Sequence, residues 1–119
     1  MEPFDDRSPI YLQIADRVRT SILAGEVKEG DQVMSTTQYA TTHRINPATA
    51  AKAMSLLVEE GLIHKRRGLG MFVSEGAADV LRTRRRATFW DDVVDPVVAE
   101  AGALGITTDD IVRYLKEGR

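Results

Sequence analysis

The sequence predicts a mostly helical fold with one small β-hairpin, followed by a short tail of two helices. Three observations lead to this prediction. Two short segments within residues 35–60 begin with residues typical of helix N-termini and are joined by a tight turn. A glycine-rich turn at residues 68–70 separates two short apolar runs, as in a hairpin. Beyond residue 76, apolar residues recur at helical spacing as far as Leu104.

Length, charge and cysteine content limit the function classes. The chain has 119 residues, 43% of them hydrophobic, which is enough for one domain plus an appendage. The net charge is −2, but basic residues outnumber acids between residues 31 and 75, so one basic face can exist on an acidic molecule. With no cysteine, disulfides and thiol chemistry are excluded. The acidic N-terminus lacks the apolar run of a signal peptide, and no segment predicts a membrane span, so we expect a cytoplasmic protein.

The first helix is expected over residues 8–24. Ser8 would cap it, and Pro9 would take its first position because proline has no N–H to leave unpaired. Gly25 would end it. The preceding residues 1–7 would form a mobile arm or an extended segment, where Phe4 could dock on a partner. The apolar stripe of this helix, predicted to be core, consists of Ile10, Ile14, Val18 and Ile22, with Tyr11 and Ala15 beside them.

A short strand edge is expected at residues 32–34, and a short second helix after it. Ser35 and Gln38 have the spacing of a capping box, in which each side chain satisfies a free backbone N–H at the helix start. This helix would end near His43, and residues 44–46 would turn the chain.

The third helix is expected from Pro47 to about Glu60. Asn46 is a favourable cap, Pro47 suits the first position, and Gly61 can adopt the left-handed conformation after the last turn. At helical spacing one side holds Ala50, Ala53, Met54 and Leu57. The other side holds Ala48, Ala51, Lys52, Ser55 and Glu59. This small and polar side could lie in a nucleic-acid groove or be an ordinary solvated helix face.

The hairpin carries a run of three cations. Residues 62–64 predict a strand, residues 65–67 are Lys-Arg-Arg, residues 68–70 form a tight turn, and residues 71–73 predict the second strand. Contiguous cations beside a glycine turn can contact phosphates or enter a minor groove.

The tail is expected to contain one long helix over residues 77–104 and a shorter one capped by Thr107, with a break at Gly105. Pro96 would either kink the long helix or follow Asp95 as the cap of a new helix, and the kink is favoured. Two helices cannot bury so apolar a side alone, so a second copy of the chain is expected to cover it. Part of this side could instead pack on the preceding domain. The residues expected to form the dimer contact are Phe89, Trp90, Val93, Val94, Val97 and Val98.

Residues 8–74 resemble the winged helix-turn-helix domain of the GntR family of bacterial transcription regulators. The resemblance is carried by PIYLQIADRVRTSILAGEVKEGDQV, by NPATAAKA at the start of the third helix, and by EEGLIHKRRGLGMFV at the wing. The short tail is similar to the YtrA-like group of the family, in which two helices form a dimer. The resemblance therefore implies a DNA-binding domain in residues 1–75 and a helical dimerisation tail in residues 76–119.

The family resemblance also implies a function, namely transcriptional regulation, expected to be repression through a palindromic operator bound by a homodimer. It further implies a small-molecule effector, which so short a tail could hold only at the dimer interface or against the winged domain. Family members usually place an arginine on DNA at the start of the second helix, where this chain has Thr37. The residues expected to bind DNA are Ser35, Thr36, Thr37, Arg44, Asn46, Ala48, Thr49, Lys52, Lys65, Arg66, Arg67, Gly68 and Gly70.

Two other classes of function are weighed against DNA binding. A winged helix can serve as a protein–protein interaction module, and the basic wing argues against this alternative. Enzymatic activity is not expected, because the only histidines, His43 and His64, fall at a predicted turn and strand without a catalytic partner pattern. No cofactor or metal site is expected.

Overall fold

The structure is a computed structural model that describes residues 3–118. Contacts along the chain divide it into two units, of which the first ends at Arg82 and the second begins at Thr83. The predicted domain division into residues 1–75 and 76–119 stays a prediction. Within the described residues, every helix is too short or too polar to cross a bilayer.

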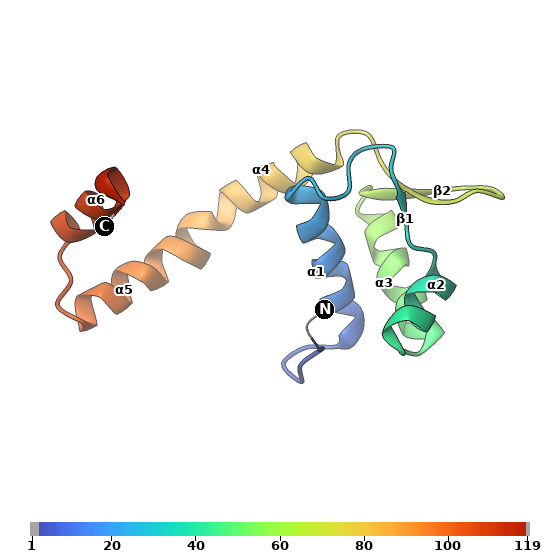
Figure 1. The fold of residues 1–119 in the computed structure, drawn as a ribbon, viewed down its shortest axis with the longest axis horizontal. Helices are drawn as coiled ribbons and strands as arrows, with labels where there is room; N and C mark the ends of the chain where they lie inside the picture. Colours follow the sequence, from blue (N-terminus) through green and yellow to red (C-terminus); the bar gives the residue numbers. More distant parts are fainter. Residues whose placement is uncertain (1–2, 119) are drawn as a thin grey trace. The chain divides into compact units, whose positions relative to one another are not determined.

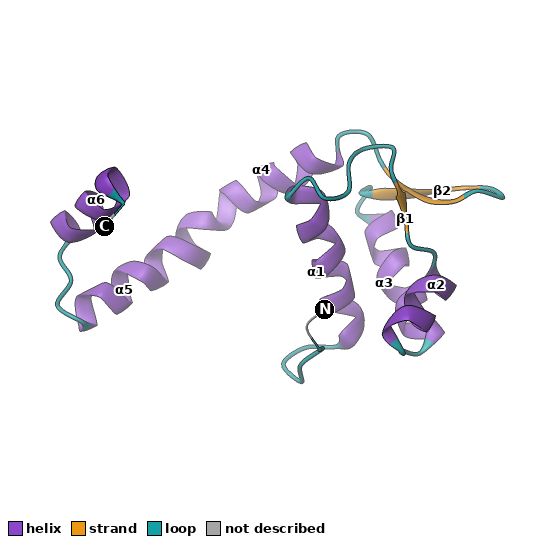
Figure 2. Cartoon of the chain, in the orientation of Figure 1, coloured by secondary structure: helices purple, strands orange, loops and turns teal. Residues whose placement is uncertain are grey.

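The first unit contains three helices, α1 (Ile10–Leu23), α2 (Thr36–His43) and α3 (Pro47–Glu59). Helix α3 packs against both α1 and α2, as Figures 1 and 2 show. The predicted starts of α2 and α3 are confirmed. Ser35 and Gln38 exchange side-chain-to-backbone hydrogen bonds of 3.1 and 3.0 Å, and the Asn46 side chain accepts the Ala48 N–H at 2.7 Å.

The start of α1 differs from the prediction, because Ser8 does not cap it. Pro9 takes the cap position with extended backbone, and no side chain bonds the first turn. The Ser8 carbonyl instead accepts a hydrogen bond from Nε2 of Gln13 at 2.8 Å. The arm is thus folded back onto α1, and the backbone of Ser8 is bound to a side chain of that helix.

Residues 3–8 of the N-terminal arm are held by two side chains of α1. Gln13 bonds both the N–H and the carbonyl of Asp5, at 3.0 and 2.8 Å. The Arg17 guanidinium lies 4.0 Å from the centre of the Phe4 ring, and Phe4 packs against the core of its own domain. Phe4, which could have docked on a partner, therefore packs on its own chain instead.

A three-stranded antiparallel sheet replaces the simple hairpin. Its strands are β1 (Gln32–Val33), β2 (Ile63–Arg66) and β3 (Gly70–Val73), and β3 lies between the other two. The strand edge expected at residues 32–34 is confirmed without Met34. Strand β2 begins one residue later than expected and includes two of the three cations.

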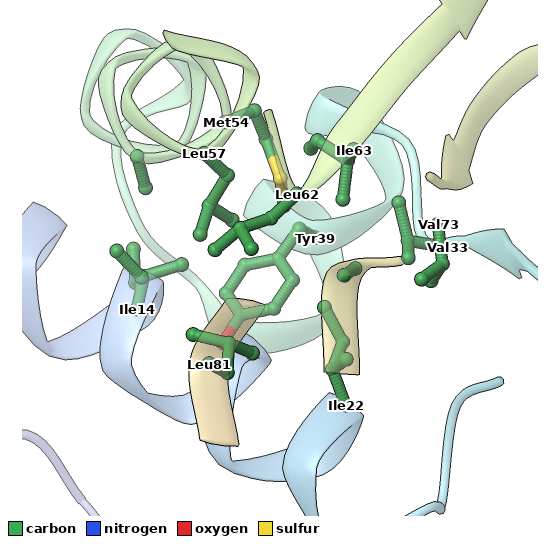
Figure 3. Packing of buried hydrophobic residues seen from close by; sticks show 13 residues of the cluster. Ile14, Ile22, Val33, Tyr39, Met54, Leu57, Leu62, Ile63, Val73 and Leu81 are labelled. Atoms are coloured by element: carbon green, nitrogen blue, oxygen red, sulfur yellow. The ribbon is translucent and has the colours of Figure 1, made fainter. Parts of the chain in front are cut away.

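The core lies between the helices and the base of the sheet (Figure 3). The four residues predicted for the inner side of α3 are all buried. In the stripe of α1, Ile14, Ala15 and Ile22 are buried, whereas Ile10 remains 40% exposed. Burial raises the pKa of the Tyr39 hydroxyl. The largest fully buried side chains are Ile14, Leu57, Leu62, Ile63 and Val73.

Helix α4 (Ala77–Phe89) starts in the first unit, where Ala77 and Leu81 complete the core. It continues through a π-helical turn, η1 (Trp90–Val94), into α5 (Asp95–Ala103). Asp95 has helical backbone angles, and its N–H bonds the carbonyl of Trp90. A new helix capped by Asp95 is therefore ruled out. The wider π turn lies directly before Pro96, where an α-helix would bring the proline ring against the preceding turn.

The second unit closes with α6 (Thr108–Glu117), which follows the predicted break at Gly105. The predicted cap is confirmed, because Thr107 and Asp110 exchange hydrogen bonds of 3.1 and 2.9 Å. The Ile106 N–H bonds the Ala101 carbonyl at 2.8 Å and ties the connection to α5.

Candidate nucleic-acid interface

The outer side of α3 is open to solvent along its length. Its inner side is held in the core, so Ala48, Ala51, Lys52 and Ser55 are exposed and Thr49 is half-buried. Three of these residues, Ala48, Ala51 and Ser55, have small side chains, so little projects from this side of the helix. A helix with this profile can approach the floor of a major groove closely, with its first residues nearest to base edges.

Two of the predicted site residues also have a structural role. Ser35 and Asn46 use their side chains as helix caps, so they orient the starts of α2 and α3. Thr36 and Thr37 occupy the first turn of α2, with Thr37 exposed. The positive end of the helix dipole at such a turn favours phosphate.

Arg44 shapes the turn between α2 and α3. Its φ of +53° is in the left-handed region, the only such value among the non-glycine residues that the structure describes. The following Ile45 N–H bonds the Ala40 carbonyl at 3.0 Å, and Ile45 packs against the core. The Arg44 side chain is exposed beside the turn.

Lys52 lies on the predicted outer side of α3, but its charge is engaged. The ammonium lies 4.1 Å from the centre of the Tyr11 ring on α1. A cation at this distance is attracted by the ring face, by about 0.5–1 kcal/mol at exposed sites. Contact between Lys52 and a base therefore requires the side chain to leave Tyr11, and its role in reading DNA stays a prediction.

The three cations of the wing (residues 63–73) do not form one cluster. Lys65 and Arg66 are neighbours on β2, so their side chains leave opposite faces of the sheet. The Arg66 guanidinium lies 4.6 Å from the centre of the Phe72 ring, and Arg67 belongs to the turn at the tip. The wing thus presents charge on both faces and at its tip, which projects beyond α2 and α3 in Figure 1.

The tip itself depends on two glycines and on Gln32. Gly68 and Gly70 have φ values of +77° and +121°. The Gln32 side chain donates a hydrogen bond of 2.8 Å to the Leu69 carbonyl and so ties the tip to β1. Gly70 lies so close to Gln32 that an added Cβ would come within 2.6 Å of its Nε2 atom.

An ion pair that the sequence did not predict joins α1 to the end of α3. Arg19 bonds both carboxylate oxygens of Glu60, at 2.9 and 2.5 Å, and also Asp16 at 2.6 Å. The hydrogen bond with Glu60 raises the pKa of Arg19. The pair neutralises Glu60, one of the two adjacent acids at the end of α3. No local pattern could have indicated it, because the partners are separated by 41 positions.

The predicted dimer contact lies on η1 and the helices on either side of it. Trp90 is 65% exposed, Val97 52% and Val98 54%, and Phe89 and Val93 are also exposed, whereas Val94 is half-buried. The Phe89 and Trp90 rings meet edge to face, with 5.5 Å between their centres. The role of these six residues as a dimer contact stays a prediction.

Comparisons with known proteins agree with this geometry. The sequence matches the profile of bacterial regulatory proteins of the gntR family over residues 10–73. It is 32% identical to the HTH-type transcriptional repressor YtrA of Bacillus subtilis, over 98% of this chain and 91% of that protein. It is 30% identical to YhcF of the same organism, described as an uncharacterized HTH-type transcriptional regulator, over 95% and 92% of the two chains. A solved GntR family transcriptional regulator from Listeria monocytogenes has a TM-score of 0.73 and 29% identity, over 96% of this chain and 98% of that one.

Proposed function

Because the chain belongs to the gntR family of bacterial regulatory proteins, we propose that it represses transcription by binding a palindromic operator as a homodimer. The family consists of transcription regulators and not of enzymes. The observation that carries the proposal is the low, exposed outer side of α3, held in place by a fully buried inner side. Repression is supported by the repressor YtrA, to which the chain is similar over nearly its whole length.

In this proposal α3 is the recognition helix. Thr49 and Lys52 supply polar groups to base edges, and Ala48 and Ala51 allow the helix to approach closely. Arg44 in the turn and Thr36 and Thr37 at the start of α2 contact the backbone of the DNA, where they set orientation without reading sequence.

The wing adds contacts that do not depend on sequence. Arg67 at the tip and Lys65 on one face can each neutralise a phosphate or enter a minor groove. Arg66 is held over Phe72, so its guanidinium loses less freedom on binding than a mobile side chain would. Gly68 and Gly70 keep the tip narrow.

A homodimer completes the proposal, because one winged helix covers a single half-site and specific affinity usually requires two. The exposed apolar side of the tail would join the two copies. A small-molecule effector would then change operator affinity by favouring one arrangement of the dimer. The protein would act in the cytoplasm, where bacterial DNA is found.

Salt dependence tests the DNA-binding part of the proposal. Operators are selected from a genomic pool with the purified protein, and binding is then measured by fluorescence anisotropy across about 50–200 mM salt. Each lost phosphate contact should reduce the slope of log K against log salt by about 0.9. Arg66→Ala with Arg67→Ala should therefore weaken binding to all sequences and flatten the slope. Arg7→Ala, which removes an exposed arginine from the arm, is the control and should leave the slope unchanged.

The outcome separates DNA binding from the alternative of a protein–protein interaction module. The affinity of an apolar protein–protein contact would change little as the salt concentration rises. If no operator is selected, or if binding ignores both salt and the wing substitutions, the DNA-binding proposal is wrong.

Assembly is tested separately by sedimentation of the wild type and of Trp90→Asp. A charge placed without a partner in a buried apolar contact is costly, so the variant should be a folded monomer that binds the operator weakly. A wild-type protein that is monomeric at micromolar concentration, yet binds a palindromic operator tightly, would contradict the homodimer.

A further inference from the structure

Leu69 is the most exposed apolar side chain of the wing, and the function proposed above does not use it. It is 63% exposed and follows Arg67 and Gly68 in the turn between β2 and β3. The contacts proposed for the wing come from its cations, which bind phosphate whatever the base sequence. A leucine side chain adds nothing to such contacts, because it has neither charge nor a hydrogen-bonding group.

The backbone at Leu69 is fixed although the side chain is exposed. Its N–H donates a hydrogen bond of 2.9 Å to the Arg66 carbonyl, and its own carbonyl accepts the bond of 2.8 Å from Gln32. Both backbone polar groups are therefore bonded within the chain. A side chain on a fixed backbone loses less freedom on binding than one on a mobile loop, so more of its contact energy is left for affinity.

The tip that carries Leu69 is narrow. Gly68 and Gly70 flank the leucine and have no side chains. The minor groove of B-DNA is about 6 Å wide, half the width of the major groove, and proteins frequently place apolar side chains on base edges there. Arg67 in the same turn supplies positive charge, which is attracted to the phosphates on both sides of such a groove.

We propose that Leu69 enters the minor groove of the operator and makes the wing select A·T over G·C at the base pair that it covers. In the minor groove an A·T pair presents only acceptors, whereas a G·C pair adds the amino group of guanine, which is a donor. A leucine on the groove floor excludes the water that would bind this donor and offers no acceptor in its place, so the G·C pair is disfavoured. This inference rests on the proposed DNA binding and adds a sequence-dependent contact to the wing.

Arg67 is the alternative source of an A·T preference at this tip. Arginine is attracted to the narrow minor groove of A·T-rich DNA, where the negative potential is enhanced. That preference follows the width of the groove over several base pairs, whereas the leucine contact depends on one amino group. The two residues can therefore be distinguished by changing single bases and single side chains.

The test changes the minor groove and leaves the major groove as it is. Operators are first selected from a genomic pool with the wild-type protein, and diaminopurine then replaces adenine at one A·T pair at a time. Diaminopurine still pairs with thymine but places an amino group in the minor groove, as guanine does. At one or two positions in each half-site, the wild type should bind the substituted operator about fivefold to tenfold more weakly in fluorescence anisotropy.

Inosine supplies the converse substitution at the positions found in this way. An inosine·cytosine pair resembles G·C in the major groove but lacks the amino group in the minor groove. The wild type should therefore bind the inosine operator within about twofold of the original, and the G·C operator about fivefold to tenfold more weakly.

Leu69→Ala is the deciding variant, because it shortens an exposed side chain and leaves both backbone hydrogen bonds of the residue in place. In this variant the loss caused by diaminopurine should fall to less than about twofold. Arg67→Ala is the matched control from the same turn. It should weaken binding to every operator and keep the loss caused by diaminopurine. Circular dichroism checks that both variants are folded.

The outcomes separate this inference from the proposal on which it rests. If Leu69→Ala keeps the loss caused by diaminopurine, or if Arg67→Ala abolishes it, the leucine does not select the base pair and the inference is wrong, while DNA binding stands. If neither diaminopurine nor Leu69→Ala changes the affinity for any operator, Leu69 lies off the DNA and is free to contact another protein, which also overturns the inference. A protein that selects no operator removes DNA binding itself, and the inference with it.

Discussion

Gly70→Ala should be a costly substitution in the wing, although it adds a single methyl group at the half-buried first residue of β3. Gly70 begins β3 with a φ of +121°, which residues with a side chain rarely adopt. Its added Cβ would lie 2.6 Å from Nε2 of Gln32. That atom is the donor of the hydrogen bond to the Leu69 carbonyl, so the amide cannot move away without losing its partner.

The expected loss of stability follows from these two terms. Holding alanine at such a φ costs about 1–3 kcal/mol. Displacing the Gln32 amide costs a hydrogen bond, about 0.5–1.5 kcal/mol, and the lower end applies because the bond is exposed. The free energy of unfolding should therefore fall by about 1.5–3.5 kcal/mol, a large part of the 5–15 kcal/mol that is usual for a domain. Gly68→Ala is the control, with a φ of +77° and no neighbour within 4 Å, and it should cost about 1–2 kcal/mol.

The assay is urea unfolding followed by circular dichroism at one fixed protein concentration, because dimerisation would otherwise shift the midpoint. Gln32→Ala should cost about 0.5 kcal/mol alone, but in combination with Gly70→Ala it removes the atom that the methyl group strikes. The double variant should then be more stable than the sum of the two single losses predicts, by about 0.5 kcal/mol. If Gly70→Ala costs no more than Gly68→Ala, or if the two losses simply add, the close approach to Gln32 does not govern this turn.

Three further predictions concern α3 and the tail. Asn46→Ala removes the acceptor of the Ala48 N–H and should lower the free energy of unfolding by about 1 kcal/mol, seen as a lower urea midpoint with unchanged slope. Lys52→Ala should change which operator bases are preferred, by about 1–3 kcal/mol at one position; an equal loss for every operator variant would assign Lys52 to phosphate. The Thr107 N–H lowers the pKa of Asp110, so the stability that this cap gives to α6 is present above the ordinary pKa of 3.8 and lost as pH falls through the lowered value. Asp110→Asn should reduce the loss of helical dichroism on acidification, and identical acid titrations would contradict this role.

The helix starts could be predicted from the sequence because their causes are local. Ser35 with Gln38, and Thr107 with Asp110, each satisfy backbone groups three positions away, and both capping boxes are present in the structure. Ser8 failed as a cap although its residue type was favourable. Pro9 stands at the cap position instead, and the Ser8 carbonyl accepts a hydrogen bond from Gln13.

Features that depend on pairing between distant residues could not be predicted in the same way. In the sequence, Lys65 and Arg66 belong to one run of basic residues. Only the register of β2 against β3 shows that Arg66 shares a face of the sheet with Phe72. The contact of Lys52 with Tyr11 and the ion pair of Arg19 with Glu60 likewise join α1 to α3 across the fold. Pro96 indicated an irregular helix, but the widened turn before it depends on how the backbone relaxes around the ring.

The π-helical turn gives the tail an unusual tolerance to changes of length. A widened turn is equivalent to one extra residue inserted into an α-helix, so deleting one residue within Trp90–Val94 could restore ordinary four-residue hydrogen bonding instead of breaking the helix. Side chains after the deletion would keep nearly the same rotation about the axis relative to those before it, because the extra residue of the widened turn adds almost no net rotation between the flanking segments. Such a deletion would leave the helical content nearly unchanged, and α5 would present the same side relative to α4. In relatives of this chain, a gap of one residue at this point would therefore be compatible with the same fold and the same side of pairing.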